Sequence, residues 1–408
     1  MTKIWSNKQS KLHYYNPGHE TAVWQNSTHY TPPASVRAIV NDLALLPAWY
    51  ADEGDYVFIS RPEQQLSDWL PMPVHLFATP LTRKEIRTNA ALLPRMEAAP
   101  WGLSPQSVHL FEELKQKEGL NIDCPVWKNE YVTLTNRQTA AGCLAEIQQS
   151  LPHISFPAPP VFLSQLEEVE DYLHWHTGPF VLKTPYSSSG RGLLWVNEKR
   201  LNDSERKQIH GIIRKQHTVS LEQALDKEAD FAMEFYSDGK GSLRYEGLSI
   251  FITNRRGAYK GNRLQTQSAL WQQLLKYTGE DTLNSIQQSV SDVLCHTFAS
   301  RYTGYLGVDM LVYKKDKESF GIHPCIEINL RYTMGLTAIR LFENHIDSSA
   351  EGIFNILCEN TPHLAYEQHI LMKQMYPPTF KNGRLQKGYL SLCPVTTHTR
   401  YTACILAK

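Results

Sequence analysis

A strict alternation of apolar and polar residues in the last third of the chain constrains its fold more than any other feature. In the run Cys325-Ile-Glu-Ile-Asn-Leu-Arg331, a polar side chain recurs at every second position from Glu327 onward. Residues two apart on a β-strand point to the same face, so Glu327, Asn329 and Arg331 are predicted to project together. The isoleucines and the leucine between them would then pack on the opposite face of a sheet.

A partner for this strand precedes it in the sequence. The run Gly307 to Tyr313 is separated from Ile322 to Leu330 by the charged turn Lys314-Lys-Asp-Lys-Glu318, which predicts an antiparallel pair. If the two strands pair, Asp309 joins the polar row. The oxygen donors of this row would suit one or two octahedral Mg²⁺ ions whose remaining positions are filled by phosphate and water. For any one of these residues in isolation, a solvated face of a half-exposed sheet is the alternative interpretation.

A second candidate site is the segment Phe180 to Gly192, in which an apolar strand leads to Lys183 and then to a loop of small residues. Small residues let backbone N–H groups approach a polyphosphate, and a lysine at a strand end adds a point charge. The pattern is neither a P-loop nor a Rossmann fingerprint. A plain hairpin turn is the alternative. The loop residues predicted to contact phosphate are Ser187, Ser188, Ser189 and Gly190.

The length of 408 residues exceeds what one hydrophobic core usually supports, so two or three packed subdomains are expected. In the first hundred residues, the apolar runs Tyr56 to Ile59 and Pro73 to Phe77 and the helix-like stretch Val36 to Leu46 predict a small α/β subdomain. The rest of the chain predicts an α+β pattern, mostly antiparallel sheet with helices on one side. The remaining predicted helices are Asn136 to Ser150, Gln165 to His176, and Leu283 to Arg301. Thr135 is predicted to be the N-cap of the first of these helices. The remaining predicted strands are Val161 to Leu163, Phe180 to Lys183, Gly192 to Val196, Phe231 to Tyr236, and Arg244 to Thr253.

Charge and cysteine usage narrow the class of protein. The 41 Lys and Arg residues balance the 41 Asp and Glu residues, which argues against nucleic-acid and membrane partners. The 7 cysteines are scattered and form no CxxC pair, as expected of reduced thiols. No secretory signal and no apolar run long enough to span a bilayer is evident in the sequence. We therefore expect a cytoplasmic protein.

The order of these features resembles the ATP-grasp superfamily over roughly residues 136–335. A Lys-bearing strand with a Ser/Gly loop is followed by Phe231-Ala-Met-Glu-Phe-Tyr236, a long helix, Asp309, and a strand with the pattern Glu-x-Asn-x-Arg. The resemblance is nearest to carboxylate–amine ligases such as D-alanine ligases and amino-acid ligases. It implies an N-terminal pre-ATP-grasp-like α/β subdomain (1–134) on the substrate side, and a two-lobed ATP-grasp domain (135–408). The small lobe would be about 150–236 and the large lobe about 237–408.

The resemblance also implies roles for individual residues. Lys183 would contact the α- and β-phosphates, and the loop from Ser187 to Gly190 would close over the triphosphate. Arg137 stands where many members have a lysine that reaches the nucleotide. The metal ligands would be Asp309, Glu327 and Asn329, with Glu327 bridging two ions, and Arg331 would face the transferred phosphoryl group. The hinge strand that presents backbone groups and a carboxylate to adenine would include Glu234, Phe235 and Tyr236. Glu246 would substitute for the ribose-binding acid.

Two further segments are less specific. The cationic run Asn254 to Arg263 is typical of a solvated loop, but in this family it would overlook the active cleft. Lys260 or Arg263 could then bind the γ-phosphate or the substrate carboxylate, and Arg263 is the choice between them. Near the N-terminus, His19 and Glu20 would help to bind the acceptor substrate, unless Tyr15 to Glu20 is a connecting turn.

The predicted activity is ATP- and Mg²⁺-dependent activation of a carboxylate as an acyl phosphate, which an amine then attacks with release of phosphate and ADP. One or two Mg²⁺ ions are expected, and Mn²⁺ could substitute. The substrates would be a small-molecule or peptide carboxylate and an amine, and the sequence leaves a homodimer open. The alternatives are an ATP-grasp kinase acting on a hydroxyl, a nucleotide-binding regulatory module without turnover, and a plain interaction protein.

Overall fold

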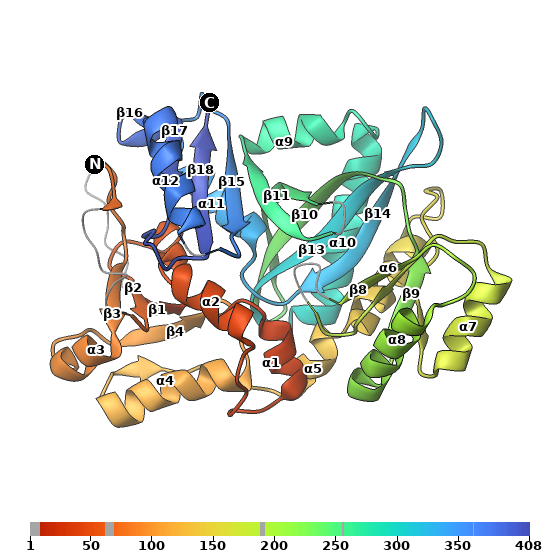
Figure 1. Ribbon diagram of the computed structural model, residues 1–408, viewed down its shortest axis with the longest axis horizontal. Helices are drawn as coiled ribbons and strands as arrows, with labels where there is room; N and C mark the ends of the chain where they lie inside the picture. The colour runs from red at the N-terminus through yellow and green to blue at the C-terminus, as the bar shows by residue number, and fades with distance from the viewer. Residues whose placement is uncertain (1–8, 62–68, 188–191, 255–256, 362) are drawn as a thin grey trace. The chain divides into compact units, whose positions relative to one another are not determined.

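The computed structural model describes residues 9–61, 69–187, 192–254, 257–361 and 363–408 (Figure 1). The chain forms two compact units. One comprises residues 1–129, 263–265 and 337–408, and the other comprises 130–262 and 266–336. The predicted division into 1–134 and 135–408 follows the sequence order, whereas the first unit also includes the C-terminal segment. Compactness alone does not define functional domains, so that division stays a prediction.

The first unit contains a five-stranded sheet in which all neighbouring strands are parallel, in the order β3-β2-β1-β4-β5. Parallel strands need crossover connections, and helices occupy most of these connections. This confirms the predicted N-terminal α/β architecture. The strands are β1 (Ser10–Tyr14), β2 (Tyr56–Ile59), β3 (Thr79–Thr82), β4 (Met96–Pro100) and β5 (Ile122–Asp123); the helices are α1 (His19–Gln25), α2 (Ala34–Asp42), the 3-10 helix η1 (Leu46–Trp49), α3 (Arg83–Asn89) and α4 (Pro105–Glu118).

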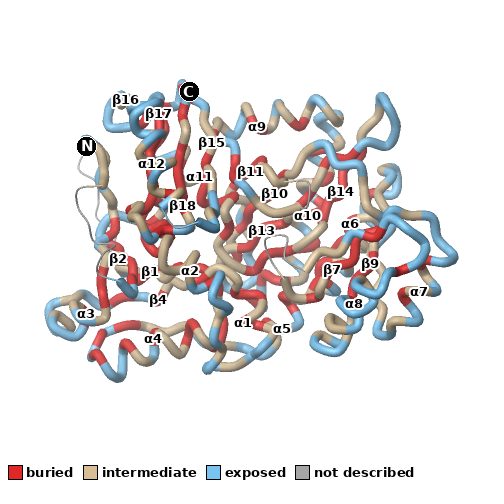
Figure 2. Tube along the Cα trace, in the orientation of Figure 1, coloured by how far each residue is buried: buried red, intermediate tan, exposed pale blue. Residues whose placement is uncertain are grey.

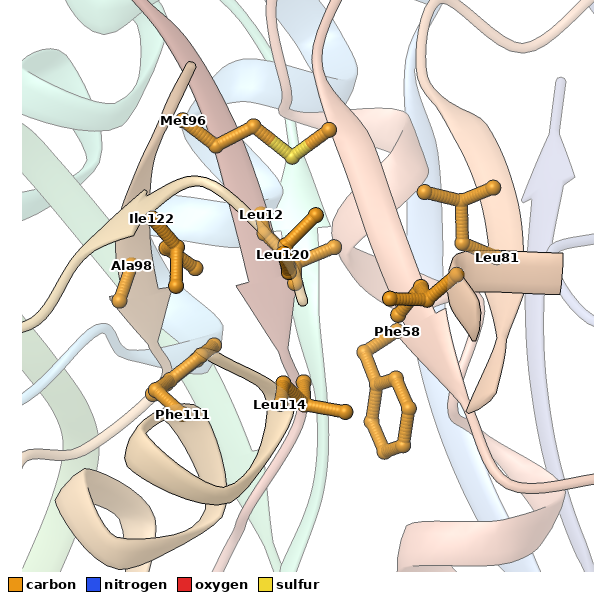
Figure 3. Close-up of a cluster of buried hydrophobic side chains, with 10 residues drawn as sticks. Leu12, Phe58, Leu81, Met96, Ala98, Phe111, Leu114, Leu120 and Ile122 are labelled. Carbon is orange, nitrogen blue, oxygen red and sulfur yellow. The ribbon is translucent and has the colours of Figure 1, made fainter. Parts of the chain in front are cut away.

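Apolar side chains from this sheet and from α4 form one buried core (Figure 3). Leu12 of β1 and Phe111 and Leu114 of α4 have no exposed surface. Helix α4 begins sharply because the Ser104 side chain accepts a hydrogen bond from the Ser107 amide. It ends at Gly119, whose φ of 75° is the left-handed conformation that glycine adopts without steric cost. The capped helix thereby keeps its apolar face against the sheet.

The C-terminal part of the same unit is an antiparallel set of strands in the order β15-β18-β17-β16. Buried hydrogen bonds from side chains to backbone carbonyls join it to the N-terminal part: the Trp49 indole donates to the carbonyl of Leu392 at 2.6 Å, and the His345 ring donates to the Trp49 carbonyl at 2.9 Å. The tube of Figure 2 shows β17 and β18 mostly buried. The elements are α11 (Met334–His345), β15 (Gly352–Cys358), α12 (Leu364–Met375), β16 (Thr379–Lys381), β17 (Arg384–Ser391) and β18 (Tyr401–Ala407).

The second unit begins with two helices and a small antiparallel sheet in the order β6-β9-β7-β8. Val169 and Leu173 of α7 and Ile209 of α8 have no exposed surface and pack on this sheet. Their spacing gives each helix one apolar face. The elements are α5 (Glu130–Thr135), α6 (Arg137–Ser150), β6 (Val161–Leu163), α7 (Leu166–Trp175), β7 (Phe180–Lys183), β8 (Leu193–Val196), α8 (Asp203–Gln216) and β9 (Val219–Gln223).

A larger antiparallel sheet follows in the same unit, with the strand order β14-β13-β10-β11-β12. Strand β10 lies at its centre, so both of its edges are hydrogen-bonded to neighbours. Helix α10 packs on β10 and β11, and α6 runs along β14. The elements are β10 (Lys227–Asp238), β11 (Leu243–Thr253), β12 (Tyr259–Leu264), α9 (Gln267–Leu274), α10 (Glu280–Phe298), β13 (Thr303–Lys314) and β14 (Phe320–Asn329).

Two local predictions are wrong. The run Pro73 to Phe77 is irregular and contains no strand, because a proline removes a backbone donor that a sheet would need. The N-cap of α6 is Asn136, whose side chain accepts from the Gln138 amide at 2.8 Å, and not Thr135. Thr135 is instead the last residue of the preceding helix α5.

Candidate functional site

The polar row predicted from the alternating sequence is formed by three neighbouring strands of the larger sheet. Asp309 of β13 lies directly opposite Glu327 of β14, and Gly307 lies opposite Asn329. On the other side of β13, Gly307 faces Glu234 of β10. The predicted pairing of the two strands is therefore confirmed. It gathers three carboxylates and an amide on one face of the sheet.

Space for these side chains depends on two glycines. A Cβ atom at Gly307 would lie 2.5 Å from a carboxylate oxygen of Glu234, and one at Gly335 would lie 2.1 Å from the other. The Glu234 carboxylate is 2% exposed and accepts hydrogen bonds from the Thr333 hydroxyl at 2.8 Å and the Ser249 hydroxyl at 3.4 Å. Burial raises the pKa of Glu234 to about 7, although these hydrogen bonds and the charge of Arg331 oppose the shift.

Negative charge is concentrated around Asp309. Burial, together with the neighbouring charges of Glu327 and Glu234, raises the pKa of Asp309 to about 8. Such a group of carboxylates favours the binding of a cation. The Arg331 guanidinium lies at the edge of the row, where it donates to the side-chain oxygen of Asn329 at 2.8 Å.

The donor set fits a magnesium ion in its chemistry. Asp309, Glu327 and Asn329 offer carboxylate and amide oxygens, the ligands that Mg²⁺ takes, and a Mg²⁺ site typically leaves positions for phosphate and water. Within the described residues, no group of three or more His, Cys, Asp or Glu side chains is arranged to hold a metal. A metal here would thus depend on the Asn329 amide or on oxygens from outside the protein. The three ligands stay a prediction.

Arg137 connects the polar row to the loop after β7. It is the first residue of α6, and its Nη2 lies 2.9 Å from a carboxylate oxygen of Glu327. Its Nε donates to the carbonyl of Thr184 at 3.0 Å, and Nη2 also donates to the Ser187 hydroxyl at 3.4 Å. The remaining terminal nitrogen, Nη1, is buried and has no hydrogen-bond partner in the described part of the chain. A buried donor of this kind is suited to an anionic ligand.

Lys183 ends β7, as the sequence predicts, and is buried. Its ammonium forms an ion pair with Glu222 of β9, the neighbouring strand in the small sheet. The loop that follows is closed by a hydrogen bond of 3.1 Å from the Thr184 amide to the carbonyl of Gly192. Gly192 has a φ of 83°, and a Cβ there would lie 2.4 Å from the Thr184 hydroxyl, so this position requires glycine.

The predicted phosphate contacts of the loop involve Ser187 and the three residues after it. Ser187 is half-buried and contacts Arg137. Ser188, Ser189 and Gly190 lie outside the described residues. Their predicted contact with phosphate stays a prediction.

The predicted hinge residues lie in a long central strand. Glu234, Phe235 and Tyr236 are in the middle of β10, which pairs with β11 on one side and β13 on the other. Their backbone groups therefore face two neighbouring strands, and their predicted contact with adenine stays a prediction. The chain passes from the small sheet to the larger sheet at residues 224–226, between the end of β9 and the start of β10.

Five further predicted residues lie on other elements of the chain. Arg263 and Lys260 are exposed on β12, and Arg263 belongs to the first compact unit. His19 and Glu20 also belong to that unit, where they are buried at the start of α1 with His19 Nδ1 and Glu20 Oε1 3.5 Å apart. Glu246 forms an ion pair of 2.6 Å with Arg244. The roles predicted for these five residues stay predictions.

The sequence did not point to four further residues of this region: Glu222, Thr333, Ser249 and His323. Glu222 is not recognisable without the pairing of β9 with β7, and Thr333 and Ser249 are visible only once the buried Glu234 is known. Burial lowers the pKa of His323 to about 4, in an environment that also contains the charges of Glu222 and Lys183. Of these residues, His323 could have been noticed in the sequence, because it is a polar residue in an otherwise apolar stretch of β14.

No protein-family model and no curated protein matches the sequence. Many solved structures match the chain, and two of them illustrate matches over almost its whole length. A biotin carboxylase from Campylobacter jejuni, in a β-γ-ATP complex, has a TM-score of 0.52 at 13% identity, over 98% of this chain and 87% of that chain. The biotin carboxylase domain dimer of the Hydrogenobacter thermophilus 2-oxoglutarate carboxylase, with MgADP, ADP and bicarbonate, has a TM-score of 0.50 at 11% identity, over 98% and 86%.

The chain therefore has the fold of the ATP-grasp enzymes, as the sequence predicts. At this level of identity the likeness concerns the fold alone. In the parts of the chain that the structure covers, no helix is both long and apolar enough to cross a membrane.

Proposed function

We propose that the protein is an ATP- and Mg²⁺-dependent ligase that activates a carboxylate as an acyl phosphate for attack by an amine, with release of ADP and phosphate. The observation that carries this proposal is the row of Asp309, Glu327 and Asn329, next to two buried cations, Lys183 and Arg137, in a chain with the ATP-grasp fold. The structurally similar biotin carboxylase was solved with a nucleotide of this kind.

The phosphates would be bound by side chains at the end of β7 and the start of α6. Lys183 offers a point charge, and the Arg137 fork offers a buried donor that has no other partner in the described residues. The loop of Ser187, Ser188, Ser189 and Gly190 would cover the phosphates with its backbone amides. Together these groups hold the triphosphate in line with the substrate carboxylate.

A divalent metal held by Asp309, Glu327 and Asn329 would supply charge neutralisation on the phosphate oxygens. The other groups act without it. Arg331, which donates to the Asn329 side chain, would stabilise the charge that the transferred phosphoryl group gains. Glu234 would support this arrangement by accepting the hydrogen bond of the Thr333 hydroxyl. No covalent enzyme intermediate is required.

For the base and the ribose we propose the segment between the two sheets. Residues 224–226 join β9 to β10, with the Ala224 amide donating to the Pro179 carbonyl at 2.9 Å and the Asp226 carbonyl accepting from the Lys314 amide at 2.8 Å. Glu222, just before them, is held by Lys183. Asp230, which follows at the start of β10, accepts a hydrogen bond from the Thr253 hydroxyl at 2.7 Å and forms an ion pair with Lys227 at 2.6 Å. Its carboxylate joins Glu246 as a candidate for the ribose hydroxyls.

The carboxylate and amine substrates would be small molecules or peptides. Arg263 remains our candidate for the substrate carboxylate or γ-phosphate, and His19 with Glu20 for the acceptor. We also keep the division into a substrate-side subdomain (1–134) and an ATP-grasp domain (135–408) as part of the proposal.

The experiment is product analysis. The protein is incubated with ATP, MgCl₂ and pooled amino acids and dipeptides, and nucleotide, phosphate and new amides are measured. ADP, phosphate and an amide in equal amounts support the ligase. A phosphorylated product without an amide identifies a kinase, and AMP with pyrophosphate contradicts the acyl-phosphate route. Failure of Mg-ATP at millimolar concentration to raise the melting temperature would argue against nucleotide binding itself.

A further inference from the structure

The ion pair between Arg137 and Glu327 joins a predicted phosphate ligand to a predicted metal ligand. We propose that Arg137 is a positioning residue that neutralises Glu327 until nucleotide arrives, so that a divalent cation enters the site with the nucleotide and binds poorly without it. This inference rests on the proposed function. It adds an order of binding that the proposed function does not contain.

Arg137 is fixed from several sides. Its backbone amide donates to the Pro185 carbonyl at 3.3 Å and its Nε to the Thr184 carbonyl at 3.0 Å, while Nη2 reaches Glu327 at 2.9 Å. One turn further along α6, the Ala140 carbonyl accepts from the Cys325 thiol at 3.5 Å, which keeps the helix against β14. These contacts fix the guanidinium next to Glu327, whereas a flexible surface side chain would reach a partner only part of the time.

The ion pair between Arg137 and Glu327 disfavours the binding of a metal ion in the absence of nucleotide. The Arg137 and Glu327 side chains are only 8% and 19% exposed, so water and salt screen their charges weakly. A divalent cation on Glu327 would lie close to a guanidinium that cannot lose its proton, and the two positive charges repel each other. To bind the Glu327 carboxylate, a free metal ion must therefore displace the Arg137 guanidinium or lie close to it.

A nucleotide changes this balance. Arg137 Nη1 is buried without a hydrogen-bond partner in the described residues, so it can donate to a phosphate oxygen without first breaking every contact of the guanidinium. Phosphate charge then compensates Arg137, and Glu327 becomes available to the metal. The two ligands favour each other through one residue, and this coupling is reciprocal by linkage.

The test measures free Mn²⁺ binding by electron paramagnetic resonance in the absence of nucleotide. Arg137→Gln removes the competing charge, so the dissociation constant for free Mn²⁺ is expected to fall about five- to tenfold relative to the wild-type protein. ATP affinity, measured by calorimetry, should weaken in the same variant. Opposite changes for the two ligands would not result from a merely structural role.

Lys183→Gln is the matched control. It also removes a buried cation of the phosphate site, but this cation is paired with Glu222 and not with a predicted metal ligand. ATP affinity should fall, and free Mn²⁺ affinity should stay within about twofold of the wild-type value, because the charge beside Glu327 is retained. If Arg137→Gln does not fold, Arg137→Lys keeps a charge without the fork that bridges Thr184 and Glu327. It should tighten free Mn²⁺ by a smaller factor, about two- to threefold.

The outcomes separate the two proposals. If the wild-type protein binds neither ATP nor Mn²⁺ in the presence of ATP, the proposed function fails. If it binds both, and the folded Arg137 variants show unchanged or weaker free Mn²⁺ binding, this inference alone is overturned. Tighter free Mn²⁺ in Arg137→Gln but not in Lys183→Gln supports it.

Discussion

The hydroxyl of Thr333 donates a hydrogen bond of 2.8 Å to the carboxylate of Glu234, which lies 99 positions earlier in the chain. This contact ties the turn after β14, where Arg331 is located, to the central strand of the larger sheet. The same Thr333 hydroxyl accepts the Leu336 amide at 2.9 Å at the start of α11. A buried acid thus supports both the polar row and the helix that follows it.

The pH dependence of stability follows from the raised pKa of Glu234. Between its ordinary value of 4.5 and about 7, the folded protein binds a proton that the unfolded chain releases. The free energy of unfolding should therefore fall as pH rises through this window, by an amount on the order of 1–3 kcal/mol for this group. Asp309, with a pKa raised to about 8, extends the loss to higher pH. Urea denaturation between pH 4.5 and pH 8.5 measures this.

Glu234→Gln provides the comparison, because it keeps the shape of the side chain and removes the charge. The variant should lose stability less steeply with pH and be more stable than the wild-type protein at pH 8. Glu318→Gln, at an exposed position of the turn between β13 and β14, should follow the wild-type curve. A Glu234→Gln curve parallel to the wild-type curve would mean that another group causes the slope.

Gly335 is predicted to be the least replaceable glycine of the site. In Gly335→Ala the new methyl group would lie 2.1 Å from Glu234 Oε1 and 2.3 Å from the Ser249 hydroxyl, both buried. We expect a loss of about 2–4 kcal/mol in the free energy of unfolding, because the carboxylate must move away from its hydrogen-bond donors. Gly142→Ala, at an exposed position of α6 with open space, should instead stabilise by about 0.5–1 kcal/mol. Thermal denaturation compares the two, and equal effects would contradict the predicted clash.

The sequence predicted the strands of the site well because their signal is local. Alternation of polar and apolar residues identified β14, and the charged turn before it identified its partner β13, so the opposition of Asp309 and Glu327 could be expected. The strand Phe180–Lys183 was also predicted with its observed bounds. Each of these predictions needed only neighbouring residues.

Contacts between distant segments could not be predicted in the same way. Nothing near Lys183 in the sequence indicates that Glu222 will pair with it, because β9 lies beside β7 only after α8 has crossed between them. The length of β10 is a similar case: Glu234 follows a hydrophobic run like many strand ends, but it lies inside a long central strand. Pairing order within a sheet is a property of the whole fold.

Glu327→Gln should abolish turnover and leave the fold nearly intact. The substitution removes the charge that is predicted to bridge the metal ions while it keeps the size of the side chain. It also leaves Arg137 without its ionic partner, so a loss of about 1–2 kcal/mol in stability is expected. ADP release and free Mn²⁺ binding are measured together, with Glu318→Gln as the control. Activity above about a tenth of the wild-type value would show that Glu327 is not a required metal ligand.

Lys183→Met tests the proposed phosphate site. The variant loses a charge-assisted contact worth on the order of 1.5–3 kcal/mol, so the affinity for Mg-ATP in calorimetric titration should fall roughly ten- to a hundredfold. Because the ammonium is paired with the largely buried Glu222, the variant also leaves a carboxylate without its cation. A moderate loss of stability should accompany the loss of affinity.

The double variant Lys183→Met/Glu222→Gln separates these two effects. Removal of both charges takes away the unpaired carboxylate, so stability should return toward the wild-type value. Affinity for Mg-ATP should stay low if Lys183 binds phosphate directly. Recovery of affinity together with stability would show instead that Lys183 acts only by neutralising Glu222. Unchanged affinity in the single variant would show that the loop after β7 is a plain hairpin without a role in nucleotide binding.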